Sequence, residues 1–296
     1  MNGFINILKP PGMTSSYAVV GVRRLLPNGV KVGHMGTLDP AAAGVLPIGV
    51  GFAARLFDYV IEKEKEYICE VTFGIETDTQ DAQGKIISQS TGDVSESDLL
   101  EVIPRFVGDI MQTPPAYSAV LKNGKKLYSI ARSGGDTTVP QRPARVESIE
   151  VLDKPGENKF MLKVVCGRGT YIRTICRDIG AALGCGAHCS FLLRSRAGRF
   201  SLDESLRLDE LTRENIAERL LPADFPIGHM PRLVAPKELQ PRVRNGMALP
   251  LGNYENGRSL AEGENARVYI ENEFVGIGRA EGEMLRFSAL KPAGEI

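Results

Sequence analysis

The sequence lacks any apolar run long enough to cross a membrane as a helix, which needs about 20 residues. The uncharged run from Pro40 to Ala54 is too short and too rich in glycine and proline. Tryptophan is absent, and histidine occurs only three times, so the histidines outside the cysteine-rich segment, 34 and 229, form no second cluster of metal ligands. The five cysteines are odd in number and follow no secretory signal, so we expect a soluble, cytoplasmic protein with reduced thiols.

Net charge is also lacking, because 36 basic residues balance 36 acidic ones. The charges are unevenly placed, however. Residues 62–109 hold 12 acids and 4 bases, whereas 117–149 hold six bases and two acids, and 165–199 hold six arginines and one acid. The two basic segments could together form a face for a polyanion, so the neutral total does not exclude a nucleic acid as partner.

Apolar periodicity predicts strands and helices in alternation, without a regular βαβ rhythm. The predicted strands are 4–8, 45–51, 67–73, 85–88, 146–152 and 160–165, and the predicted helices are 17–26, 53–61, 99–106, 126–132, 171–183 and 210–221. This order favours an α+β fold around a mainly antiparallel sheet.

The character of the chain changes after Pro222, Pro226 and Pro231, which mark a linker. Beyond the linker, residues 235–244 predict one short helix. The segments 267–270, 274–279 and 284–288 then predict short strands separated by glycine-rich turns. We therefore expect a small C-terminal β-barrel.

One stretch, 33–47, combines a lone carboxylate, Asp39, with three glycines. Glycine permits positive φ or a close backbone approach, and Pro40 biases Asp39 away from the α region, so the stretch predicts a shaped loop. A carboxylate in a largely apolar loop is costly unless a cation or hydrogen bonds compensate it, which suggests a nucleophile or a base. The alternative is an Asp-Pro turn that only caps the next element.

Arg173 is the candidate partner for this carboxylate. It closes the sequence Gly-Thr-Tyr-Ile-Arg at 169–173, on the first turn of a predicted helix. An opposite charge a few ångströms from Asp39 would hold it ionised. The alternative is an ordinary surface arginine on an amphipathic helix.

Competing chemistries lack their motifs. A glycoside hydrolase needs two carboxylates, and Asp78 and Asp81 lie on a polar turn, so we expect no second acid in surroundings like those of Asp39. No G-x-x-x-x-G-K-[ST] phosphate loop occurs. The G-x-G-x-x-A match at 49–54 lacks a βαβ context, so we interpret it as strand-to-helix packing and expect no nucleotide cofactor.

A second group of polar residues has ligand-capable side chains. Cys185, His188 and Cys189 lie close in sequence, with Cys176 as a fourth candidate. Because the usual paired C-x-x-C spacing is absent, we expect no metal site here. His34 is a planar group near Asp39 that could stack on a base, although a lone loop histidine is usually structural.

Taken in order along the chain, several motifs resemble those of the TruB family of pseudouridine synthases. The Thr-Leu-Asp-Pro context of Asp39 distinguishes this family from synthases that carry Arg-Leu-Asp. The resembling positions are 6–15, 33–47 with its G-H-x-G-T-L-D-P pattern, Tyr67, 115–119, Gly124, Tyr128, Ala131, Arg132, 169–173, Leu192 and Arg194.

This resemblance implies a pseudouridine synthase fold in residues 1–230, with a mainly antiparallel mixed sheet flanked by helices. It implies a PUA-like, RNA-binding β-barrel in residues 231–296. The implied activity is the isomerisation of uridine 55 in the T-loop of tRNA, by base flipping and without cofactor. The implied partner is the tRNA T-stem-loop, and we expect a monomer.

The resemblance also assigns roles to residues. Asp39 is the implied nucleophile, Arg173 its partner, and Tyr67 a residue that stacks on the uracil and moves a proton. Leu192 would wall the pocket, and His34 would fill the stack left by the flipped base. The implied substrate-binding set is Lys9, Pro10, His34, Tyr171 and Leu192.

Two other functions remain open from the sequence. One is a non-catalytic RNA-binding or tRNA-folding chaperone module. The other is a hydrolase of small molecules with an aspartate nucleophile, which lacks a second acid. A pure binding module requires neither a nucleophile nor its cationic partner, so Asp39, Tyr67 and Arg173 together favour the enzyme.

Overall fold

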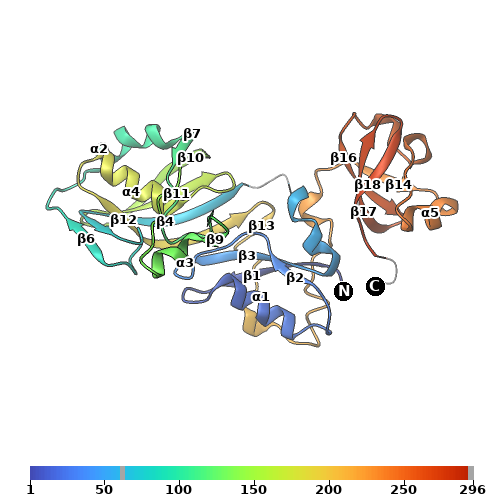
Figure 1. The fold of residues 1–296 in the computed structure, drawn as a ribbon, viewed down its shortest axis with the longest axis horizontal. Coiled ribbons are helices and arrows are strands. Elements are labelled where there is room, and N and C mark those ends of the chain that lie inside the picture. The colour runs from blue at the N-terminus through green and yellow to red at the C-terminus, as the bar shows by residue number, and fades with distance from the viewer. Residues whose placement is uncertain (61–63, 293–296) are drawn as a thin grey trace.

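The computed structural model describes residues 1–60 and 64–292 of the chain. In these residues a nine-stranded sheet and a five-stranded sheet lie beside each other (Figure 1). The large sheet has the order β1-β3-β12-β4-β11-β10-β7, with β2 beside β3 and β13 beside β12. Its strands are β1 (Gly3–Lys9), β2 (Val32–His34), β3 (Ala43–Val50), β4 (Lys65–Phe73), β7 (Gly108–Gln112), β10 (Arg142–Gly156), β11 (Lys159–Cys166), β12 (Ala187–Ala197) and β13 (Phe200–Ser201).

A narrow joint divides the large sheet. The parallel pair β3 and β12 meets over two positions, where Leu193 faces Ala43 and Arg194 faces Gly44. The other described pairs of this sheet are antiparallel. The predicted α+β fold with a mainly antiparallel mixed sheet is confirmed. The joint brings residues from distant parts of the sequence together at one place.

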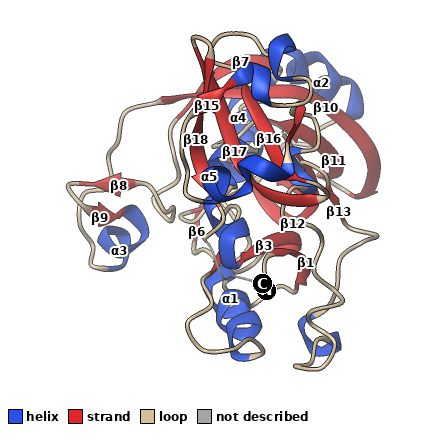
Figure 2. Ribbon diagram, turned by 90° about the vertical axis from the view of Figure 1, so that its right-hand side faces the viewer, coloured by secondary structure: helices blue, strands red, loops and turns tan. Residues whose placement is uncertain are grey.

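Helices cover the two parts of the sheet separately. α4 packs against β12 and β4 with α2 beside it, whereas α1 packs against β1 and β2 (Figure 1). α3 and the hairpin β8–β9 project from the body of the protein (Figure 2). None of the described helices is long and apolar enough to cross a membrane. The bounds are α1 (Ser15–Arg24), α2 (Glu96–Val102), α3 (Leu127–Arg132), α4 (Ile172–Ala182), β5 (Ile75–Thr77), β6 (Ile86–Gln89), β8 (Leu121–Lys122) and β9 (Lys125–Lys126).

The central strand β12 was not predicted from the sequence. Strand signals depend on strict alternation, and β12 breaks it with two register shifts, one between Cys189 and Phe191 and one between Arg194 and Arg196. Each shift moves the following side chains to the other face. A strand that holds the two parts of the sheet together was therefore hidden by its irregular pattern.

Two predicted helices are wrong. Residues 53–61 form part of two short 3₁₀ helices, Gly51–Arg55 and Phe57–Tyr59, with Ile61 outside the described residues. Residues 210–221 form turns, because side chains compete for the backbone groups a helix would use. The side-chain amide of Asn215 donates to the backbone carbonyl of Glu210 at 2.9 Å. The Thr212 hydroxyl accepts from the backbone amides of Glu214 and Asn215, each at 3.3 Å.

The small sheet has the order β14-β16-β17-β18-β15 and is consistent with the PUA-like barrel expected from the sequence. An apolar cluster joins it to the large sheet: Phe52 and Leu56 lie in one cluster with Ile277, and Phe274 packs against it. The Tyr59 hydroxyl also donates to the carbonyl of Ser288 at 3.1 Å. The bounds are β14 (Arg232–Ala235), α5 (Gln240–Arg244), β15 (Leu249–Pro250), β16 (Asn265–Ile270), β17 (Glu273–Glu281) and β18 (Met284–Leu290).

Candidate active site

The loop that carries Asp39 runs from the end of β2 to the start of β3. Hydrogen bonds from Lys9 and Gly12 connect this loop to the segment after β1. The ammonium of Lys9 donates to the carbonyls of Pro10 at 2.9 Å, Met13 at 2.8 Å and Pro40 at 3.3 Å. The amide of Gly12 donates to the same Pro40 carbonyl at 2.8 Å. Lys9 is fully buried, so its three carbonyl partners hold both segments in one shape.

Arg173, the second residue of α4, forms an ion pair with Asp39. Its Nη2 lies 2.8 Å from Oδ2 of Asp39, as the hypothesis from the sequence requires. The arginine side chain is only 5% exposed, whereas the aspartate is 36% exposed. The interpretation of Arg173 as a surface residue is therefore wrong. A buried cation presents a carboxylate that is itself open to a substrate.

The guanidinium of Arg173 also contacts two backbone carbonyls and a second carboxylate. Nη1 donates to the carbonyl of Thr79 at 2.9 Å and lies 3.4 Å from Oδ2 of Asp81, while Nη2 donates to the carbonyl of Tyr117 at 3.0 Å. The expectation that no second acid shares the surroundings of Asp39 is thus wrong. Asp81 does lie on a polar turn, but the turn folds back toward the site.

A cavity of about 200 Å³ opens beside this network. Asp39, Asp81 and Arg173 line it together with Leu192 and Cys189. Pockets for drug-sized ligands have volumes of about 300 Å³ or more. A smaller cavity with a few charged groups suits one small planar group such as a nucleobase.

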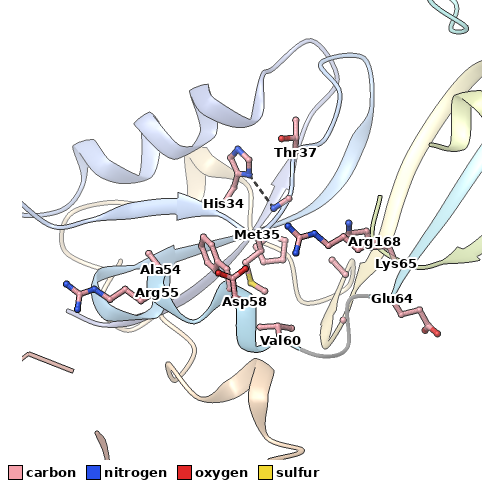
Figure 3. Close-up of a pocket in the computed structure, with 15 residues that line it drawn as sticks. His34, Met35, Thr37, Ala54, Arg55, Asp58, Val60, Glu64, Lys65 and Arg168 are labelled. Carbon is pink, nitrogen blue, oxygen red and sulfur yellow. Dashed lines mark hydrogen bonds between the residues drawn. The ribbon is translucent and has the colours of Figure 1, made fainter. Parts of the chain in front are cut away.

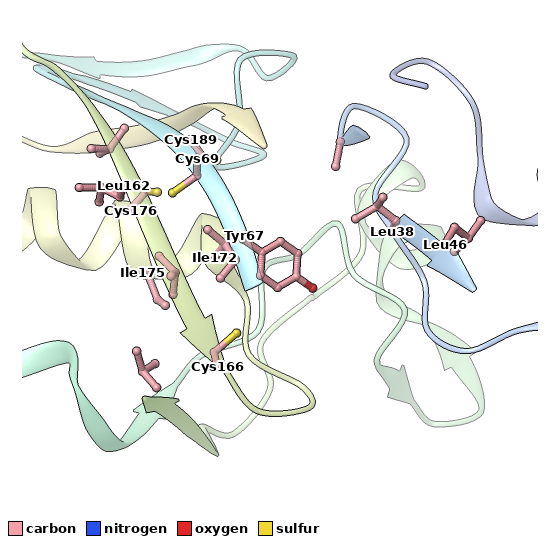
Figure 4. Packing of buried hydrophobic residues seen from close by; sticks show 14 of the residues in the cluster. Leu38, Leu46, Tyr67, Cys69, Leu162, Cys166, Ile172, Ile175, Cys176 and Cys189 are labelled. Atoms are coloured by element: carbon pink, nitrogen blue, oxygen red, sulfur yellow. The ribbon is translucent and has the colours of Figure 1, made fainter. Parts of the chain in front are cut away.

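Tyr67 lies on β4 next to the narrow joint and is 7% exposed. Its ring leaves the sheet with the hydroxyl directed toward Leu38, in the Asp39 loop (Figure 4). Burial raises the pKa of Tyr67, so its phenol is neutral at physiological pH. A neutral phenol can donate a proton as well as stack.

His34 lines a different and larger cavity of about 450 Å³ (Figure 3). Its Nδ1 accepts from the amide of Gly36 at 3.3 Å. Burial, with the nearby Arg194 cation, lowers the pKa of His34, which favours the neutral ring. Charged side chains of both signs line the same cavity, namely Arg55, Lys65 and Arg168 with Asp58 and Glu64.

The other predicted substrate-binding residues hold the frame of the site. Tyr171 precedes α4, and Gln112 fixes its backbone: the Tyr171 amide donates to Oε1 at 3.0 Å and its carbonyl accepts from Nε2 at 3.1 Å. Burial raises the pKa of Tyr171 as well. Pro10 is exposed and contributes the carbonyl that Lys9 binds.

The side chains of the cysteine-rich segment point to different surroundings. Nδ1 of His188 lies 3.0 Å from the carbonyl of Ile75, while Cys189 lies with Cys69 and Cys176 in the core (Figure 4). No group of three His, Cys, Asp or Glu side chains in the described part of the chain is arranged to hold a metal ion.

Comparison with known proteins agrees with the geometry. The model of the TruB family pseudouridylate synthase N-terminal domain matches residues 23–172, and that of the tRNA pseudouridylate synthase B C-terminal domain matches residues 173–238. The chain is 43% identical over 284 residues to tRNA pseudouridine synthase B of Alkaliphilus oremlandii, covering 96% of this chain and 94% of the relative. It is 40% identical over 286 residues to the protein of the same name from Clostridioides difficile, covering 94% of each.

A solved structure shows the same fold. A chain in the crystal structure of a Cbf5-Nop10-Gar1 complex superimposes with a TM-score of 0.72 at 26% identity. The match covers 98% of this chain and 85% of that one. Both sheets therefore belong to an arrangement that the two proteins share.

Proposed function

The chain belongs to the TruB family of tRNA pseudouridine synthases, which isomerise uridine in tRNA, and we propose that it acts on uridine 55 of the T-loop through a nucleophilic Asp39. The observation that carries this proposal is the ion pair between Asp39 and the buried Arg173 at the wall of a small cavity. Arg173 pairs with the carboxylate and fixes its direction. A fixed, partly open carboxylate is what a covalent step or a cationic ribose requires.

The reaction exchanges two bonds at one ribose carbon. The bond from C1′ to N1 breaks, the uracil turns, and a bond from C1′ to C5 forms. N1 gains one proton and C5 loses one, so a group near the base has to transfer protons. Tyr67 is the residue we propose for this task and for stacking on the uracil, and Leu192 is one of the residues that line the cavity.

A uridine inside a folded loop has to leave its stack before Asp39 can reach it. We propose that His34, held neutral by its surroundings, fills the space that the base leaves. Lys9 and Pro10 then shape the floor of the cavity, and Tyr171 positions Arg173 through the start of α4. The cavity that His34 lines would accept the RNA next to the flipped base.

The basic segments 117–149 and 165–199 would bind the phosphates, while the shape of the loop and its unpaired base provide selectivity. We propose residues 1–230 as the synthase domain and 231–296 as a PUA-like RNA-binding domain. We further propose that the protein acts as a cytoplasmic monomer without cofactor. Binding through phosphates requires that tRNA affinity fall as salt increases.

The decisive experiment incubates purified protein with an unmodified tRNA transcript, without added metal or nucleotide, and maps pseudouridine by base-specific chemical labelling. We expect modification at the single T-loop uridine by the wild type and none by Asp39→Asn. The variant should keep its fold and its affinity for tRNA, because the side chain is partly exposed. Binding without modification by the wild type would instead support a chaperone, and modification at another uridine would refute the assignment of position 55.

A further inference from the structure

Arg194 is the largest fully buried side chain of the described residues, with 1% exposure. No acidic side chain of the described chain lies within ion-pair distance of it, in contrast to Arg173 with two carboxylates. Its Nη1 has no hydrogen-bond partner. A buried cation without a counter-charge costs several kcal/mol of stability. The burial of Arg194 is therefore not explained by a contribution to stability, which suggests a role in function.

The register of the sheet places Arg194 in line with two residues of the candidate site, Lys9 and Tyr67. Across the joint, Lys9 of β1 faces Gly44 of β3, Gly44 faces Arg194 of β12, and Arg194 faces Tyr67 of β4. Directly opposed residues on neighbouring strands point to the same face of a sheet. Lys9, Arg194 and Tyr67 therefore lie in one row on one face.

The hydrogen bonds of Arg194 reach the loop that carries the nucleophile. Its Nε donates to the carbonyl of Val45 at 2.7 Å, just after the loop, and its Nη2 to the carbonyl of Gly36 at 3.4 Å, within it. The same guanidinium thus touches both ends of the Asp39 loop and stands beside Tyr67. It links the two residues that act on the substrate.

The charge of Arg194 acts on the Tyr67 phenol. Burial raises the pKa of Tyr67, and the positive charge of the neighbouring Arg194 opposes this. The other titratable groups that act on the phenol are Cys166 of β11 and Asp39, and both raise the pKa. Arg194 is therefore the group that favours a negative charge on the Tyr67 oxygen.

We infer that Arg194 is a positioning residue of the reaction, which holds Tyr67 and the Asp39 loop in one frame and stabilises the Tyr67 phenolate while it carries a proton. The inference rests on the proposed function. Tyr67 first gives its proton to N1 of the detached uracil and becomes a phenolate. After the bond from C5 to C1′ has formed, the phenolate takes the proton from C5. The proton lost at C5 balances the one gained at N1, and Tyr67 is restored.

The test measures the ionisation of Tyr67 directly, without turnover. The ultraviolet signal of tyrosinate is followed as pH is raised, and the signal of Tyr67→Phe in the same background is subtracted to isolate one phenol. We expect Tyr67 in Arg194→Gln to titrate at higher pH than in the wild type. Arg196→Gln is the matched control: it lies on the same strand, but its charge pairs with Glu64 at the surface, so the Tyr67 titration should not move.

Turnover provides the second measurement. We expect the single-turnover rate of Arg194→Gln to fall at least about tenfold, with tRNA affinity within about threefold of the wild type. A fluorinated tyrosine at position 67, whose phenol ionises more readily, should restore part of the lost rate. A purely structural role for Arg194 would show no such rescue, and neither would an arginine that binds an RNA phosphate.

The other possible results also either support or refute this role of Arg194. If Arg194→Gln lowers tRNA affinity but leaves the Tyr67 titration unchanged, Nη1 binds the RNA and the inference is wrong. If Arg194→Gln does not fold, Arg194→Lys retains the charge: a Tyr67 titration close to the wild type supports the inference, and one well above it overturns it. If the wild type forms no pseudouridine, the proposed function fails, whereas the titration still reports on the two residues.

Discussion

Arg173 pairs with Asp39 over 2.8 Å through Nη2 while its Nη1 lies 3.4 Å from Asp81, so one buried guanidinium is shared by two carboxylates. The two acids differ in exposure: the side chain of Asp39 is 36% exposed and that of Asp81 only 16%. The more open carboxylate is free to meet a substrate, and the more buried one fixes the arginine. We therefore expect substitutions of Asp39 and of Asp81 to have different effects.

Removing the arginine should damage both the fold and the reaction. Arg173→Met leaves two carboxylates and two carbonyls without their partner, so we expect the free energy of unfolding to fall by about 3–5 kcal/mol. Urea denaturation measures this. Arg177→Met is the control on the same helix, because the pair of Arg177 with Asp178 is partly exposed and should contribute less than about 1 kcal/mol. Equal losses for the two variants would contradict the network.

Asp81→Asn should slow the reaction without unfolding the protein. The amide keeps an oxygen for the Thr79 hydroxyl, 2.6 Å away, but presents no negative charge to Arg173. We expect the single-turnover rate to fall about tenfold, with tRNA affinity unchanged, because Arg173 is then less well fixed. Asp78→Asn on the same turn is the control, since Oδ1 of Asp78 accepts from the amide of Lys85 at 2.8 Å, away from the cavity. A similar loss in both variants would show that the turn matters, not the charge.

Much of this arrangement could be predicted from the sequence. The strand that holds Tyr67 and the strand that follows the Asp39 loop were both predicted, and the ion pair of Asp39 with Arg173 follows from the chemistry of an isolated carboxylate. The role of Asp81 could not, because a turn in sequence does not reveal which way it folds. Arg194 was noted only as part of a resemblance, since its position opposite Tyr67 depends on β12, whose register shifts conceal it.

The half-buried Lys65 should make stability depend on pH in a defined direction. Burial, with the Arg194 cation nearby, lowers its pKa to about 8, against about 10.4 in an unfolded chain. Between these values the unfolded state binds more protons, so this group makes the protein more stable as pH rises from about 8 to about 10. At pH 7 the charged, partly desolvated ammonium of Lys65 lowers the stability of the fold.

Lys65→Met should therefore raise the free energy of unfolding at pH 7, by an amount on the order of 1 kcal/mol. The gain over the wild type should shrink as pH rises above about 8, where Lys65 loses its proton in the folded state. Urea denaturation at several pH values measures both effects. Lys125→Met, at an exposed position, should show no such trend. A constant loss at every pH would mean that the lysine stem, not its charge, determines the effect.

The joint between β3 and β12 should tolerate no side chain at Gly44. A Cβ there would lie 2.2 Å from the carbonyl oxygen of Arg194, and its φ of +114° is one that other residues rarely adopt. Gly44→Ala should therefore cost more than about 3 kcal/mol, because backbone strain adds to the clash. Gly12→Ala is the matched control: its φ is +85°, but nothing lies within 4 Å of its Cβ, so strain alone should cost about 1 kcal/mol.

The joint also predicts how Gly44→Ala affects the reaction. Moving β12 away from β3 separates Arg194 and Tyr67 from the Asp39 loop, so the single-turnover rate should fall even at temperatures where the variant is fully folded. A misplacement of about 1 Å can cost a factor of about 100 in rate. Gly12→Ala should retain most of its rate, because the amide of Gly12 can still donate to the Pro40 carbonyl. Wild-type turnover in a folded Gly44→Ala variant would show that the alignment of the two sheet parts does not control the site.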